Sequence, residues 1–89
     1  MDVETRDAVI RNTRLLVEWF ASELRPENIQ DAGELLDHGE WGEAFDLICT
    51  QVYEYEVPVS REQYTVIEQT GRMLGMDSAD WDYLKELIG

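Results

Sequence analysis

The single histidine of the chain lies among carboxylates, and this is a combination from which a metal site could be built. Glu34 lies one helical turn before His38, and Asp37 and Glu40 are its close neighbours in the sequence. Imidazole nitrogen and carboxylate oxygen together can bind a divalent cation. A histidine is also favourable at the C-terminal end of a helix, where carbonyl dipoles concentrate negative charge. We favour this second role for His38, and we predict no metal site and no bound cofactor.

The residue combinations that catalysis requires are missing from the sequence. No serine, histidine and acid are arranged for nucleophilic catalysis, and no glycine-rich loop could hold a phosphate. Cys49 is the only cysteine, so it can form neither an intramolecular disulfide nor a cysteine-based zinc site. Its place at the flank of an apolar helix face predicts a small buried hydrophobic side chain. The sequence therefore predicts a protein that is not an enzyme.

The candidate side chains are carried by segments with helical periodicity. Apolar residues recur at helical spacing over about 3–24, 27–38, 40–56 and 61–74, and over a short last segment from about residue 78. Links of two to five residues join these segments, so neighbouring helices should run antiparallel. Only residues 53–59 resemble a strand, and that stretch is short. The prediction is an all-α, compact bundle of four to five short antiparallel helices, forming one domain over residues 1–89.

Specific residues mark where the helices begin and end. Pro26 suits the first turn of the second helix, and Gly39 suits a left-handed cap at its end. Ser60 with Gln63 matches a capping box at the start of the fourth helix. We expect Gly42 to allow the second and third helices to approach closely. We expect the apolar face of the third helix to consist of aromatic and aliphatic residues: Trp41, Phe45, Ile48, Val52 and Tyr55.

Negative charge is concentrated in the middle of the chain. The 89 residues contain 20 acidic and 7 basic side chains, for a net charge of −13. No lysine or arginine occurs between Arg25 and Arg61, although this stretch contains nine acidic residues. Such a chain is unsuited to binding nucleic acid directly or to docking on an anionic membrane. The charge run is either a solvated face that maintains solubility or a surface that attracts a cationic partner.

An aromatic residue inside the charged stretch favours the second interpretation. If Tyr55 belongs to the apolar face of its helix, Tyr53 points to the opposite side, among carboxylates. Tyrosine is enriched among the residues that dominate binding energy at protein interfaces. The alternative is that Tyr53 packs against the first or the last helix. We predict that the partner-binding residues are Glu34, Asp37, Glu43, Asp46, Tyr53 and Glu54.

The central part of the chain resembles a known family. The segment from His38 to Phe45, which begins His-Gly-Glu-Trp-Gly, and the segment from Tyr53 to Ser60 are similar to those of the MafI-type immunity proteins. The resemblance covers about residues 35–67 and implies a small helical protein encoded beside a bacterial polymorphic toxin of the contact-dependent growth inhibition type. Its implied function is to bind and neutralise one cognate toxin domain, often a nuclease. The adjacent tyrosine pair of the DNase-colicin immunity proteins is absent, since Glu54 separates Tyr53 from Tyr55.

These observations combine into one functional hypothesis and its alternatives. We expect an immunity protein that binds the C-terminal domain of its toxin, a basic nuclease, with the monomer as the favoured free state. The acidic start and the lack of a long apolar run predict a cytoplasmic protein that does not enter membranes. The first alternative is an acidic nucleic-acid mimic, or a regulator, that binds a host DNA- or RNA-binding protein. The others are a metal-sensing domain around His38 and an adaptor without inhibitory function.

Overall fold

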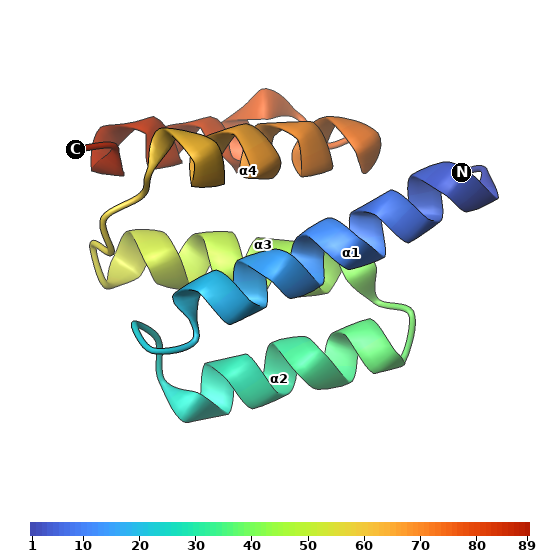
Figure 1. Cartoon of the computed structure of the whole chain (residues 1–89), viewed down its shortest axis with the longest axis horizontal. Coiled ribbons are helices and arrows are strands. Elements are labelled where there is room, and N and C mark those ends of the chain that lie inside the picture. The colour runs from blue at the N-terminus through green and yellow to red at the C-terminus, as the bar shows by residue number, and fades with distance from the viewer.

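The computed structural model describes all 89 residues, and its regular structure is helical throughout. Four α-helices are followed by two short 3₁₀ helices: α1 (Val3–Phe20), α2 (Pro26–Asp37), α3 (Trp41–Glu54), α4 (Arg61–Met73), η1 (Ser78–Asp80) and η2 (Asp82–Leu87). Consecutive α-helices run in opposite directions (Figure 1). The predicted all-α antiparallel bundle is therefore confirmed. None of its helices combines the length and the apolar character that crossing a bilayer requires.

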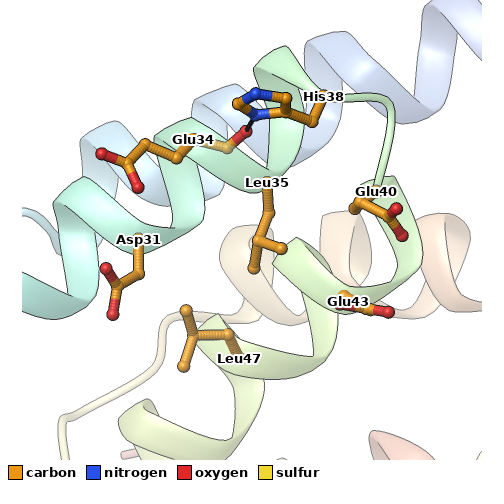
Figure 2. A pocket seen from close by; sticks show the side chains of 7 residues that line it. All are labelled: Asp31, Glu34, Leu35, His38, Glu40, Glu43 and Leu47. Atoms are coloured by element: carbon orange, nitrogen blue, oxygen red, sulfur yellow. Dashed lines mark hydrogen bonds between the residues drawn. The ribbon is translucent and has the colours of Figure 1, made fainter.

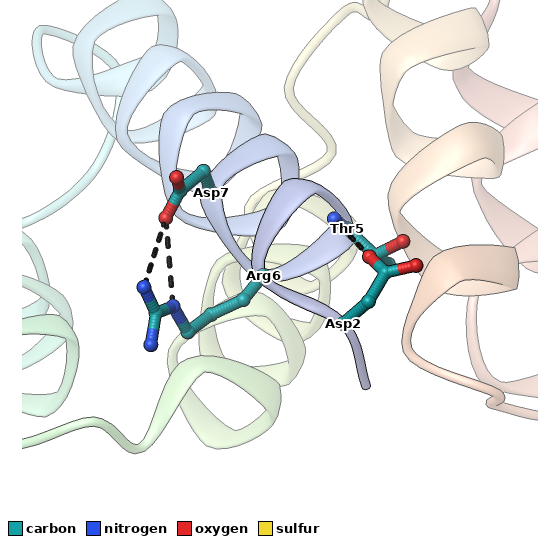
Figure 3. A network of polar contacts seen from close by, with 4 residues as sticks. All are labelled: Asp2, Thr5, Arg6 and Asp7. Atoms are coloured by element: carbon teal, nitrogen blue, oxygen red, sulfur yellow. Dashed lines mark hydrogen bonds and ion pairs between the residues drawn. The ribbon is translucent and has the colours of Figure 1, made fainter.

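The helix ends follow local signals in the sequence. The Asp2 carboxylate accepts a hydrogen bond of 2.7 Å from the Thr5 backbone N–H and so caps α1 (Figure 3). At the start of α4 the Gln63 N–H donates to the Ser60 hydroxyl oxygen, and the Ser60 N–H donates to the Gln63 side chain, which confirms the capping box. Gly39 follows α2 with a φ of +77°, so the predicted left-handed cap is also confirmed.

The core lies where α1 crosses the other helices. In Figure 1, α1 runs between α2 on one side and α4 with the C-terminal segment on the other, and it packs against α2, α3 and α4. Its inward face bears Val9, Thr13, Leu16 and Phe20, all of which are buried as the helical spacing predicts. The α3 residues Phe45, Ile48 and Val52 are buried as well. Cys49 is buried beside them, as predicted, and burial raises the pKa of its thiol.

The short last helix expected at the end of the chain is formed in two pieces. The 3₁₀ helices η1 and η2 are separated at Trp81, whose φ of −144° no continuous helix allows. The segment is held by the buried Trp81 and Leu84 side chains and by a backbone hydrogen bond of 3.0 Å from the Val59 N–H to the Leu87 carbonyl. An isolated bridge between Val59 and Ile88 is the nearest approach to β structure. The C-terminal segment is therefore a packed strap and not an extra bundle helix.

Two expectations about individual residues were wrong. Tyr55 is 44% exposed and does not belong to the apolar face, because α3 ends at Glu54 and Glu56 then turns with a φ of +51°. Gly42 is not a point of close approach, since a Cβ added there would have no neighbour within 4 Å. The close approach occurs at Gly71 of α4, where an added Cβ would clash with the Trp81 ring. Trp41 is only half-buried.

Candidate functional site: an acidic groove beside α3

A hollow of about 620 Å³ lies along the seam between α2 and α3. Its α2 wall consists of residues spaced three or four apart, which fall on one side of a helix. The first turns of α3 and the residue before it supply the other wall. We call this hollow the acidic groove, and it is lined by Asp31, Glu34, Leu35, His38, Glu40, Glu43 and Leu47 (Figure 2). Four of these seven side chains are carboxylates.

The groove combines an apolar strip with a charged rim. Leu35 of α2 and Leu47 of α3 lie between the carboxylate-bearing side chains in Figure 2, and Leu47 also packs against the core. Farther along the seam, the Asn28 side-chain amide donates a hydrogen bond of 3.0 Å to the Gln51 side chain and ties α2 to α3. The groove can therefore accept a side chain with an apolar stem and a cationic end, such as lysine or arginine.

His38 ends α2 and is tied to it through its own ring. Its Nδ1 lies 2.7 Å from the backbone carbonyl oxygen of Glu34, and because a carbonyl only accepts, Nδ1 is the donor. The Glu34 carbonyl also accepts the His38 backbone N–H at 3.0 Å, so the ring adds a second hydrogen bond to it and holds His38 at the C-terminal end of α2. No group of three or more His, Cys, Asp or Glu side chains is placed to hold a metal ion.

The carboxylates of the groove are not neutralised within the molecule. The structure contains four ion pairs, and none of them includes Asp31, Glu34, Glu40 or Glu43. Of the nine acidic residues between Arg25 and Arg61, only Glu27 and Asp37 pair with an arginine. The negative charges of the other seven acidic residues add up in the solvent in front of α2 and α3. Their summed field attracts cations over a distance set by the ionic strength.

The predicted partner-binding residues fall into separate places on this surface. Glu34 and Glu43 line the acidic groove. Asp37 lies outside it and pairs with Arg14 of α1 at 3.1 Å, although its side chain remains 68% exposed. Asp46 is exposed on α3, close enough to Tyr83 of η2 that its charge contributes to raising the pKa of that phenol, behind the larger effect of burial. Tyr53 and Glu54 lie in a second hollow.

The second hollow lies between the end of α3 and η2 and has a volume of about 550 Å³. We call it the tyrosine hollow, and its lining consists of Thr50, Tyr53, Glu54, Glu56, Glu86 and Leu87. Tyr53 is 41% exposed, and its ring meets that of Tyr83 edge-on with 4.9 Å between centroids. Its hydroxyl donates a hydrogen bond of 3.2 Å to Glu86, and this bond raises the pKa of Tyr53. Tyr53 therefore both faces solvent and packs against the C-terminal segment.

The structure adds residues to the two hollows that were not predicted to bind a partner. Asp31, Leu35 and His38 share the groove face of α2 with Glu34, and their helical spacing is a signal that could have selected them. Glu86 and Leu87 reach the tyrosine hollow only because the C-terminal segment returns to α3, and no sequence pattern indicates that return.

In comparisons with known proteins, no family model, no curated protein and no solved structure matches this chain.

Proposed function

We propose that this protein is an immunity protein that binds and neutralises a cognate bacterial toxin domain. The partner is a basic domain, with a nuclease as the leading class, and the complex contains one copy of each protein. The resemblance of residues 35–67 to the MafI-type immunity proteins suggested this function, and the surface supplies an independent argument. The inhibitor acts by occupying the partner and carries out no chemistry of its own.

The observation that supports the proposal most strongly is the unpaired charge of the acidic groove. Carboxylates that lie close together repel one another and lower the stability of the compact state. Solubility could be maintained by charges spread over the surface, but here four carboxylates without ion pairs, those of Asp31, Glu34, Glu40 and Glu43, line one hollow with an apolar strip. A cationic protein surface would relieve the repulsion and cover Leu35 and Leu47 together.

The groove suits a basic nuclease for a physical reason. A nuclease needs a positively charged surface in order to hold the phosphates of its substrate. An inhibitor with a dense negative face is attracted to that surface from a distance, which speeds the encounter. Once the surfaces meet, water leaves the apolar strip and lysine or arginine side chains lie against the carboxylates. Nucleic acid is then excluded, because its phosphates would compete for the same cations.

The decisive experiment is co-expression of the tagged chain with the polypeptide encoded immediately upstream. The expected result is that the upstream polypeptide alone stops growth, that the tagged chain restores it, and that the two purify as a one-to-one complex. A harmless upstream polypeptide, or toxicity without rescue or complex, would contradict the proposal. That result would shift the interpretation to an acidic regulator of a host DNA- or RNA-binding protein, to be sought by purification from whole lysate.

Charge-reversal variants test whether the acidic groove is responsible. The variant with Glu34→Lys and Glu43→Lys should lose rescue and complex formation. The matched control carries Glu18→Lys and Glu23→Lys, which make the same change in net charge at exposed positions outside the groove. Equal loss in both variants would mean that total charge, and not the groove, determines binding.

A further inference from the structure

Aromatic rings and carboxylates meet at three places on this molecule, and two of them hold an arginine of the chain itself. The Arg72 guanidinium lies 5.5 Å from the centre of the Trp81 ring and pairs with Glu68 at 3.3 Å. The Arg25 guanidinium pairs with Glu27 at 3.3 Å. The nearby Tyr55 side chain, with the Glu27 charge as a smaller contribution, raises the pKa of Arg25.

The third place is the tyrosine hollow, and it has no cation from this chain. None of its carboxylates, Glu54, Glu56 and Glu86, belongs to an ion pair. Lys85 is next to Glu86 in the sequence but forms no ion pair either. The hollow therefore offers an aromatic ring and carboxylates, the same groups that lie beside Arg72 and Arg25 elsewhere in the chain.

The aromatic wall of this hollow is held in position before any partner arrives. The edge-on contact with Tyr83 and the hydrogen bond to Glu86 restrain the Tyr53 ring at two points. A restrained side chain loses little conformational entropy on binding, so more of the interaction energy appears as affinity. Only four large hydrophobic residues of the chain are exposed, and Tyr53 and Tyr55 are two of them, both at the end of α3.

We propose that the tyrosine hollow is a docking surface for an arginine side chain of the basic partner protein, at a position separate from the acidic groove. This inference rests on the proposed function, because it specifies how part of the toxin domain is recognised. The arginine side chain enters between Tyr53 and the carboxylates of Glu54, Glu56 and Glu86. Its methylene groups lie against Leu87 and Thr50.

The geometry favours arginine over lysine. A guanidinium group is planar, so it can lie against an aromatic ring and present several N–H donors to carboxylates around its edge. An ammonium group is compact and more strongly hydrated, and it gains less from the ring. The acidic groove has no Phe, Tyr or Trp ring in its lining and should accept either cation. The hollow thus adds selectivity to the general attraction that the groove provides.

The test compares hexa-arginine with hexa-lysine as probes of the purified 89-residue protein at low ionic strength. NMR signals of the Tyr53 and Tyr83 rings report on the hollow, and the methyl signals of Leu35 and Leu47 report on the groove. We expect hexa-arginine to shift the Tyr53 signals and to bind about three- to fivefold more tightly than hexa-lysine. Equal affinity of the two peptides, or shifts confined to Leu35 and Leu47, would overturn the proposal.

Two variants with matched controls locate the preference. Tyr53→Leu should abolish the arginine preference, whereas Tyr55→Leu, at the same end of α3, should retain it. Because Tyr53→Leu also removes the contact with Tyr83, the variant Glu86→Gln provides a second test, with Glu62→Gln as the exposed control of equal charge. Glu86→Gln should weaken hexa-arginine binding more than Glu62→Gln. Preservation of the preference in Tyr53→Leu, or equal effects of the two Gln variants, would contradict the assignment.

These results separate this inference from the proposed function. Rescue of growth without any arginine preference would support the immunity function and would contradict only the proposal that the tyrosine hollow binds an arginine. The opposite result would be an arginine preference that depends on Tyr53 together with a harmless upstream polypeptide. It would support arginine binding by the tyrosine hollow and contradict the proposed toxin partner.

Discussion

The seam between α2 and α3 and the seam between α4 and the C-terminal segment are both made by neighbouring helical segments, yet only the first has a solvent-filled hollow along its outer side. The α2/α3 seam has carboxylates on both sides and a hollow of about 620 Å³. The other seam is closed by Trp81, which is 2% exposed and lies directly against the backbone of Gly71. The close contact of Trp81 with Gly71 leaves no hollow along this part of the seam.

The difference indicates that the stability of the fold and the proposed recognition of a partner depend on different parts of the molecule. Closing the α2/α3 seam would bring unpaired carboxylates together out of water, at a large electrostatic cost. Closing the Trp81 seam buries one of the largest apolar surfaces in the core, although it leaves the Trp81 Nε1 and the Tyr64 hydroxyl without hydrogen-bond partners. The closed seam should therefore dominate the free energy of unfolding, and the open seam should dominate binding.

The largest expected effect is that of Trp81→Ala. Removing a fully buried tryptophan leaves a cavity and should lower the free energy of unfolding by about 3–5 kcal/mol. The comparison variant is Trp41→Ala, at a half-buried tryptophan, which should lower it by less than half as much. Urea denaturation followed by circular dichroism measures both. Equal losses would mean that the C-terminal strap is not a principal source of stability.

The next effect contrasts two helical glycines. Gly71→Ala places a methyl group against the Trp81 ring and should destabilise the protein by about 1–3 kcal/mol. Gly33→Ala adds a methyl group to α2 where nothing lies within 4 Å, and it should stabilise the protein by about 0.5–1 kcal/mol. The same denaturation curves measure the two changes. If Gly71→Ala stabilised the protein, the Trp81 ring could move away from the added methyl group without a loss in the free energy of unfolding.

A smaller effect is expected on the rate of association with the partner obtained by co-expression. Reversing two charges of the open side, with Glu43→Lys and Asp46→Lys, should slow association about tenfold at low ionic strength, because long-range attraction is lost. Stopped-flow fluorescence measures the rate, and the difference should shrink as salt is added. The control is again Glu18→Lys with Glu23→Lys. An association rate unaffected by the first pair would remove the acidic face from the mechanism.

The smallest effect concerns the cap at the start of α1. The hydrogen bonds from Thr5 hold the pKa of Asp2 below its ordinary value of 3.8 (Figure 3). A lowered pKa in the folded state contributes stability above pH 3.8, and that contribution is lost as the pH falls through the folded value. Asp2→Asn should therefore remove a small part of the acid-induced loss of stability, because Asn caps without titrating. Identical acid denaturation profiles for the two proteins would contradict this.

The helices and most of the core could be predicted because their signals are local. Ser60 and Gln63 lie three residues apart, Gly39 follows its helix directly, and the inward face of α1 repeats within a single element. Tyr55 was wrongly placed on the apolar face because its helical spacing was counted as if the helix continued through it, whereas α3 ends one residue earlier. The charge concentration could also be counted without a structure. Which carboxylates share a hollow depends on the pairing of two helices.

The sequence by itself determined the helical class and most helix ends, because these follow from neighbours within a turn or two. It also determined that nine of the 20 acidic residues, and no lysine or arginine, lie between Arg25 and Arg61. Only the tertiary structure decided that Glu34 and Glu43 share the acidic groove while Asp37 turns to Arg14. It also decided that Glu86 meets Tyr53 across 33 residues of chain. The physical reason is that such contacts depend on how whole segments pack, and the packing of the C-terminal strap depends on Trp81 finding space at Gly71.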